Sequence, residues 1–224
     1  MENGNFIHLV FVIDESGSMY PSVSDVVNGF KQMIDEQKKV KEGKCSVSLY
    51  TFADSWKEVY LGKDVSEIDD IQYHPNGLTA MNDGIGVAID RVGKWLSDMD
   101  EKDRPSKNLV IIMTDGEENN SKEYSLDRVK EMIKHQTEKY SWDFIYIGTD
   151  ITTKKDVNRL GVTKMSMSSR KNFMENYDMI NCATTAYRAC ESVTTASATM
   201  DSYLNMETDK ITKKFEKEIG KKIE

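Results

Sequence analysis

The residues Phe6–Ile13, close to the N-terminus, are apolar at nearly every position. A strand with one face in water alternates apolar and polar side chains, whereas a strand of a parallel sheet covered on both faces is apolar throughout. This run therefore predicts a fully buried strand, in a fold with a layer on each side of the sheet. Further strand-like segments are Ser46–Phe52, Leu109–Thr114 and Trp142–Ile147.

Segments with helical periodicity separate these strands. Val23–Lys38 places apolar residues on one side and Lys and Glu on the other, and Met81–Leu96 and Tyr124–Lys139 repeat the pattern. This alternation predicts an α/β fold: a doubly wound, mostly parallel open sheet with helices on both faces and right-handed crossovers. Trp56–Leu61 is expected to pair with the preceding strand and to add one antiparallel edge strand.

After Gly148 the pattern becomes weaker. Three further elements are predicted there: a short helix over Thr152–Arg159, a strand over Val162–Met167 and a helix over Lys171–Cys190. Residues 191–206 permit a helix without requiring one, and 207–224 carry one narrow apolar stripe among charges, which either docks on the domain or frays. We therefore divide the chain into a domain over residues 5–190 and a C-terminal helical extension or tail over residues 191–224.

Composition narrows the class of protein. The 224 residues suffice for one sizeable core, and 38% hydrophobic with 30% charged residues is typical of a soluble protein. No apolar stretch approaches the length of a membrane span. A net charge of −8 argues against nonspecific nucleic-acid binding.

Location is inferred from the N-terminus and from the cysteines. The first five residues contain no basic region, so we expect no signal peptide. The three cysteines, Cys45, Cys182 and Cys190, are odd in number and lack metal-ligand spacing, as expected for free thiols in a reducing compartment. We expect the protein to be cytoplasmic.

Polar side chains follow the first strand directly. Asp14, Ser16 and Ser18 place one carboxylate and two hydroxyls at alternate positions, and oxygen groups of this kind suit a hard divalent cation such as Mg²⁺. Thr79 precedes the second long helix, and Asp115 follows the strand Leu109–Thr114. If those two strands are neighbours, Asp14 and Asp115 emerge side by side at the same sheet edge. Taken singly, the three pieces have ordinary interpretations as a helix cap, a loop residue and a turn.

With these three pieces in this order, the chain resembles the von Willebrand factor A (vWA) family. The metal-ion-dependent adhesion site (MIDAS) of that family has the pattern D-x-S-x-S, then a Thr, then an Asp. The resemblance covers roughly residues 5–190 and implies a complete MIDAS whose metal residues are Asp14, Ser16, Ser18, Thr79 and Asp115.

The resemblance also implies a role for each side chain. Ser16 and Ser18 would bind the metal directly, Thr79 would do so when a ligand is engaged, and Asp14 and Asp115 would act mainly through bound water. Few charged groups would then touch the metal, which stays electrophilic and accepts a carboxylate from an Asp or Glu of a partner protein. The implied cofactor is Mg²⁺, with Mn²⁺ or Ca²⁺ as alternatives.

The leading functional hypothesis is therefore a metal-dependent protein–protein interaction module, not an enzyme, in an intracellular protein of bacterial or phage origin. An alternative is a Mg²⁺-dependent phosphohydrolase of the haloacid dehalogenase type, although that chemistry needs a second Asp where Ser16 stands. A third hypothesis is an assembly protein with a purely structural metal, whose tail drives oligomerisation. The partner, the oligomeric state and the preferred metal are left open.

Residues near the predicted site receive more modest roles. Asp83 is expected to support the loop or cap a helix, and Gly77 to permit a tight turn that brings Thr79 in. Residues 117–119 either tune the charge of the site or form a solvated loop. His8 has no spaced ligand partner and is expected to be structural, while Tyr20 is a candidate partner contact.

Overall fold

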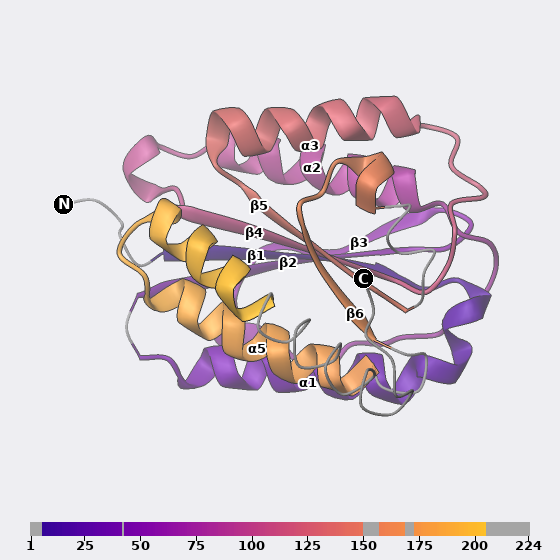
Figure 1. Cartoon of the computed structure of the whole chain (residues 1–224), viewed down its shortest axis with the longest axis horizontal. Coiled ribbons are helices and arrows are strands. Elements are labelled where there is room, and N and C mark those ends of the chain that lie inside the picture. Colours follow the sequence, from indigo (N-terminus) through magenta and orange to yellow (C-terminus); the bar gives the residue numbers. More distant parts are fainter. Residues whose placement is uncertain (1–5, 42, 150–156, 169–172, 205–224) are drawn as a thin grey trace, which may run out of the picture.

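The computed structural model describes residues 6–41, 43–149, 157–168 and 173–204. Within them, a twisted six-stranded sheet lies between layers of helices (Figure 1). The strand order is β3-β2-β1-β4-β5-β6; β3 is antiparallel to β2, and all other neighbours are parallel. The strands are β1 Phe6–Asp14, β2 Lys44–Phe52, β3 Trp56–Asp64, β4 Lys107–Thr114, β5 Asp143–Thr149 and β6 Lys164–Ser168.

The central strand β1 explains why its sequence is apolar on nearly every residue. It pairs with β2 on one side and with β4 on the other, so both of its edges are hydrogen-bonded. Leu9 and Phe11 pack into the core on one face of the sheet, and Val10 and Val12 pack into the core on the other face. Each face is covered, so a polar side chain on either face loses water and is tolerated only where it finds a buried partner.

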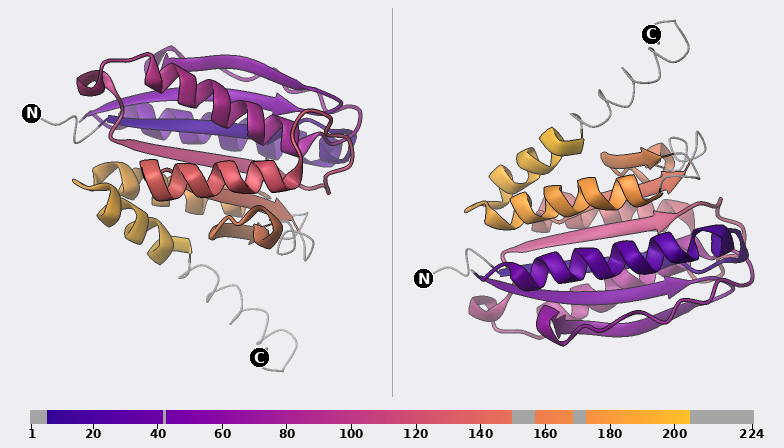
Figure 2. Two further views of the ribbon diagram at one scale, coloured as in Figure 1. Left: turned by 90° about the horizontal axis from the view of Figure 1, so that it is seen from above. Right: turned by 90° about the horizontal axis from the view of Figure 1, so that it is seen from below.

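The helices form two layers, as the views from above and below show (Figure 2). One face of the sheet carries α1 (Val23–Lys39) and α5 (Phe173–Ala189), which pack against each other. The opposite face carries α2 (Met81–Ser97) and α3 (Leu126–Tyr140). The predicted class, a doubly wound and mostly parallel sheet with one antiparallel edge strand, is confirmed. None of the helices in the described part of the chain combines the length and apolar composition that crossing a bilayer requires.

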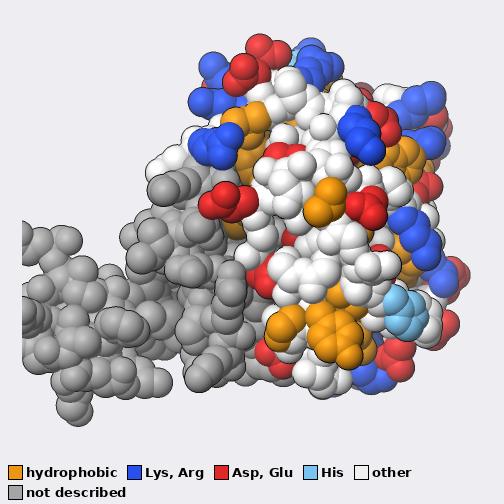
Figure 3. All heavy atoms as spheres, turned by 90° about the vertical axis from the view of Figure 1, so that its right-hand side faces the viewer, with side chains coloured by type: hydrophobic (Ala, Val, Ile, Leu, Met, Phe, Trp, Pro, Cys, Tyr) orange, Lys and Arg blue, Asp and Glu red, His pale blue; other side chains and the backbone are white. Residues whose placement is uncertain are grey.

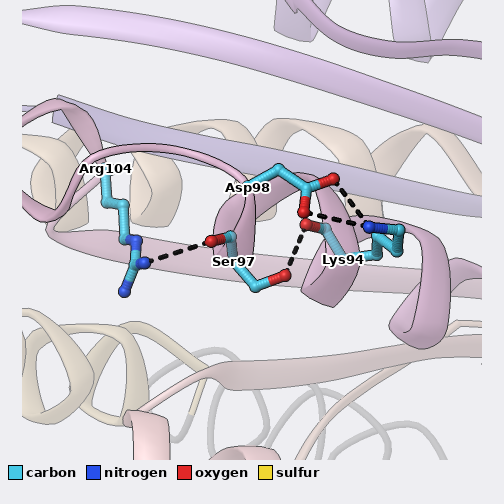
Figure 4. Close-up of polar contacts among 4 residues, drawn as sticks. All are labelled: Lys94, Ser97, Asp98 and Arg104. Atoms are coloured by element: carbon cyan, nitrogen blue, oxygen red, sulfur yellow. Dashed lines mark hydrogen bonds and ion pairs between the residues drawn. The ribbon is translucent and has the colours of Figure 1, made fainter.

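Polar contacts close the end of α2 before the chain enters β4 (Figure 4). The Arg104 guanidinium donates to the carbonyls of Met99, at 3.0 Å, and Ser97, at 3.4 Å. Lys94 forms an ion pair of 2.9 Å with Asp98 one turn later. The Arg104 contacts satisfy carbonyls that a helix end leaves open. All of these contacts lie at the end of the sheet opposite to the candidate site.

Residues 193–204 are helical and pack on the domain. Ala196, Met200 and Leu204 are buried in the core that lies beneath α1 and α5. On the polar side, the Ser197 hydroxyl donates to Asp143 at 2.7 Å. The described part of the expected C-terminal extension is thus joined to the core, and the domain boundary at residue 190 stays a prediction.

Two predicted elements fall wholly or largely outside the described residues. The apolar stripe over 207–224 lies beyond them. Of the helix expected over Thr152–Arg159, only 157–159 are described, and these residues are helical.

Candidate metal site

The candidate site begins where β1 and β4 end side by side. Ile13 pairs with Met113, so Asp14 and Thr114 follow at neighbouring positions on the same sheet edge. Asp14 is fully buried, and each of its carboxylate oxygens has a donor. Oδ1 accepts the backbone N–H of Ser16 at 2.7 Å, and Oδ2 accepts the Thr114 hydroxyl at 2.6 Å. The carboxylate is therefore held in one orientation at the floor of the site.

The two serines of the first loop connect Asp14 to Asp115. Ser16 Oγ lies 3.1 Å from Ser18 Oγ, and the Ser18 hydroxyl donates to Asp115 Oδ1 at 2.6 Å. Ser16 is buried and Ser18 is exposed, so the row of oxygens runs from the floor of the site towards solvent.

Thr79 reaches the same point from a third segment. A Cβ atom placed on Gly116 would lie 3.4 Å from both Ser18 Oγ and Thr79 Oγ1, and 3.7 Å from Asp14 Oδ2. Oxygens from two separate segments therefore converge beside Gly116 of a third segment, on a spot that is open because residue 116 has no side chain. Around it lies a hollow of about 370 Å³ whose walls include Ser16, Ser18, Thr79 and Asp115. The structure thus brings all five predicted residues together.

The Thr79 loop is fixed by hydrogen bonds to its backbone groups. Thr79 N donates to Asn119 Oδ1 at 2.9 Å, and Asn119 N donates back to Thr79 O at 3.0 Å. Gly77 has φ +77°, and its carbonyl accepts the N–H of Gly17 at 3.0 Å, which joins this loop to the first one. A side chain at residue 77 would strike Asp54 as well as strain the backbone. Gly77 is therefore the tight turn that the sequence predicted.

The loop after Asp115 is held by two carboxylates that do not line the hollow. Asp83 accepts the backbone N–H groups of three successive residues, 122–124, at 2.7–2.9 Å. Glu118 accepts Asn82 N at 2.8 Å and Ser121 N at 2.7 Å. Both carboxylates therefore support loops, as expected for Asp83. The sequence suggested only a charge-tuning role or a solvated loop for Glu118 and Asn119, and it gave no role to Thr114. The contacts of all three were missed, because each depends on a distant residue.

Burial determines the pKa of the Asp14 carboxylate at the floor of the site. Loss of water raises the pKa of Asp14 from its ordinary 3.8 to about 6, against the hydrogen bonds from Thr114 and Ser16, which lower it. The negative charge of Asp115 raises it further. A cation at the point of convergence would relieve both penalties. The donors are all oxygens, as Mg²⁺ and similar hard cations prefer, so the residues present fit such an ion.

The interpretation of this cluster as a metal site depends on the hydroxyl groups of Ser16, Ser18 and Thr79. Within the described ranges, no group of three or more His, Cys, Asp or Glu is placed to hold a metal ion. A cation at this edge of the sheet would therefore depend on the Ser and Thr oxygens as well as on the two carboxylates.

Fold and site together define an α/β domain with a cluster of oxygen ligands at the carboxyl ends of its central strands. Residues 8–186 match the von Willebrand factor type A domain, and the chain belongs to this family. Domains of this family generally mediate protein–protein interactions, often with a metal, and are typically not enzymes. No protein with a curated description matches the sequence.

Solved structures show the same fold at low sequence identity. One is proximal thread matrix protein 1 from the mussel byssus with a zinc-occupied MIDAS motif, at 18% identity and a TM-score of 0.56, covering 80% of this chain and 46% of that one. A second is a von Willebrand factor type A protein from Catenulispora acidiphila, at 15% identity and a TM-score of 0.55, covering 81% of this chain and 43% of that one. A third is a mutant of the PilB minor pilin from Streptococcus sanguinis, at 11% identity and a TM-score of 0.55. This match covers 88% of this chain and 62% of that one. The chain thus spans less than two thirds of each of these proteins.

Proposed function

We propose that the protein is a metal-dependent interaction module that binds an acidic side chain of a partner protein through a complete MIDAS. The observation that carries this proposal is the convergence of Ser18, Thr79 and Asp14 oxygens on the open position beside Gly116. The zinc-occupied MIDAS of the similar mussel protein supports a metal at this place in the fold.

The residues divide into ligands and supports. Ser16, Ser18 and Thr79 would hold the cation through their hydroxyls, and Asp14 and Asp115 would act mainly through water. A divalent cation, Mg²⁺ by preference and Mn²⁺ or Ca²⁺ as alternatives, supplies an electrophilic position for an incoming carboxylate. The chain's own task is to keep the hydroxyls aimed and the incoming position open.

The burial of Asp14 favours binding over phosphoryl transfer. A nucleophilic carboxylate needs an oxygen that the substrate can reach, whereas Asp14 is fully buried and both of its oxygens accept hydrogen bonds. Its position suits a group that orients the Ser16 loop rather than one that attacks a phosphate ester.

The test is partner capture from a lysate of the native source on the immobilised protein, in Mg²⁺ and in EDTA. A partner retained only in Mg²⁺, and lost with Ser16→Ala/Ser18→Ala, would support the proposal. Ser24→Ala, at an exposed serine of α1, is the matched control and should retain the partner. Partners that ignore both the chelator and the double substitution would place the interaction on another surface.

A further inference from the structure

Two exposed apolar side chains lie on the loops that carry the candidate ligands. Leu78, next to Thr79, is 52% exposed and lines the hollow. Tyr20, two residues after Ser18 in the short 3-10 helix Gly17–Ser22, is 74% exposed. In the described part of the chain the other large apolar side chains with comparable exposure are Val59 and Tyr140, which lie on β3 and at the end of α3.

The exposure of Leu78 does not come from a loose loop. Its own N–H donates to Asp54 Oδ1 at 2.9 Å. The N–H groups of the residues on either side are also bonded, Gly77 to Asn76 Oδ1 and Thr79 to Asn119 Oδ1, each at 2.9 Å. The backbone therefore holds an apolar side chain in water at the rim of a polar hollow, where a partner that covers it would gain hydrophobic burial.

The charge of the hollow restricts the partner further. Among the described residues that line it, the charged ones are Asp115 and Glu117, and none is Lys or Arg. With Asp14 at the floor, three carboxylates face two positive charges of a divalent cation. Once a partner carboxylate has bound, a second acidic group beside it would be repelled, whereas a basic one would pair with Glu117.

The view onto this edge agrees with that charge balance (Figure 3). Apolar and acidic side chains lie around the middle of the described surface. Lys and Arg side chains lie mostly around its margins, at the top, the right and the bottom.

We propose, resting on the proposed function, that the partner segment presents a single Asp or Glu flanked by an apolar and a basic side chain. The carboxylate binds the metal, the apolar side chain packs on Leu78, and the basic side chain faces Glu117. Clusters of acidic residues are excluded by the same carboxylates that hold the cation.

The experiment is a selection from displayed nine-residue peptides with Glu fixed at the centre and all other positions randomised. The protein is immobilised, and selection is carried out in Mg²⁺ and in EDTA. A second library with Gln at the centre is the control for the carboxylate. In Mg²⁺, the Glu library should enrich apolar residues and Lys or Arg beside the centre and deplete Asp and Glu.

Variants assign each preference to its side chain. Leu78→Ser should weaken the apolar preference and lower the affinity of a selected peptide about tenfold. Glu117→Gln should remove the basic preference. Val59→Ser and Tyr140→Ser, at exposed apolar residues away from the hollow, are matched controls and should change neither preference.

The possible failures are distinguishable. Metal-dependent enrichment of Glu over Gln without a flanking preference, with acidic flanks, or with preferences unchanged in the variants would overturn this inference and leave the proposed function standing. Equal enrichment of both libraries in Mg²⁺ and in EDTA would overturn the proposed function, and this inference with it.

Discussion

The Thr114 hydroxyl donates a hydrogen bond of 2.6 Å to Asp14 Oδ2, and this bond joins the ends of the two central strands at the floor of the hollow. Thr114 Oγ1 also accepts the N–H of Gly116 at 3.1 Å. One hydroxyl thus positions both the buried carboxylate and the glycine beside which the candidate ligands converge. The residue lies outside the adhesion-site pattern but is central to its geometry.

Replacing Thr114 by Val keeps the shape of the side chain and removes the hydroxyl. Asp14 Oδ2 and Gly116 N would each lose a partner, so the free energy of unfolding should fall by about 1–3 kcal/mol. Urea unfolding in EDTA measures this loss. Thr114→Ser keeps the hydroxyl and serves as the control; a Val variant as stable as the Ser variant would contradict the role given to the bond.

The apolar pattern of the sequence was sufficient to predict the central strands of the sheet. β1 is apolar at nearly every position because its side chains enter two cores, and this property is visible without a structure. The sequence did not show where β3 ends. We expected its end at Leu61, whereas the strand continues to Asp64. Gly62 adopts φ +65° and donates to Ser48 Oγ at 2.9 Å, and the pairing of β3 with β2 is irregular here. This irregularity in the pairing looks, in sequence, like the end of a strand.

The candidate site likewise contains residues that the sequence predicts and residues whose role only the structure shows. Asp14, Ser16 and Ser18 are close in the chain, so their spacing alone suggests a common function. Thr114 acts on a residue 100 positions away, and Asn119 on one 40 positions away. No local pattern distinguishes them from an ordinary strand residue and a loop residue, so only the folded chain shows what they do.

Addition of Mg²⁺ should raise the melting temperature. A ligand that binds only the native state stabilises it by about 2.7 kcal/mol at a hundred times its Kd, which corresponds to about 5–10 °C for a chain of this size. Differential scanning fluorimetry with and without EDTA measures the shift. Ser16→Ala/Ser18→Ala should lose it, and Ser24→Ala should keep it. A shift that survives the double substitution would place the metal elsewhere.

Lys107, at the start of β4, should be important for stability. It is 1% exposed, and its Nζ donates to the carbonyls of Arg188 at 2.9 Å and Cys190 at 2.6 Å, at the end of α5. Burial lowers its pKa. Lys107→Met should reduce the free energy of unfolding by about 3 kcal/mol, because buried carbonyls lose a charged donor.

Chemical denaturation of Lys107→Met measures this effect. Lys134→Met, in an exposed ion pair with Glu138, is the control and should change stability little. If both variants were equally stable, the Lys107 contacts would contribute no more than a surface charge.

His8 should make stability depend on pH below neutrality. It lies fully buried in β1, with Ser46 Oγ at 2.8 Å and Ser48 Oγ at 3.1 Å from its ring nitrogens. Burial lowers its pKa from the ordinary 6.5 to about 3. Between these values the unfolded chain binds a proton that the native protein does not, so stability is lost as the pH falls below 6.5, by about 1.4 kcal/mol per unit.

The comparison of wild type with His8→Gln isolates this effect. Asp14, whose native pKa of about 6 exceeds its ordinary 3.8, acts in the opposite direction, because the native form takes up its proton first. Asp14 is present in both proteins, so its contribution cancels in the difference between their free energies of unfolding. That difference should shift against the wild type by about 2.3 kcal/mol between pH 6.5 and 4.5. His135→Gln, at an exposed histidine, should leave the wild-type slope unchanged. Parallel curves for wild type and His8→Gln would mean that His8 is protonated within the fold.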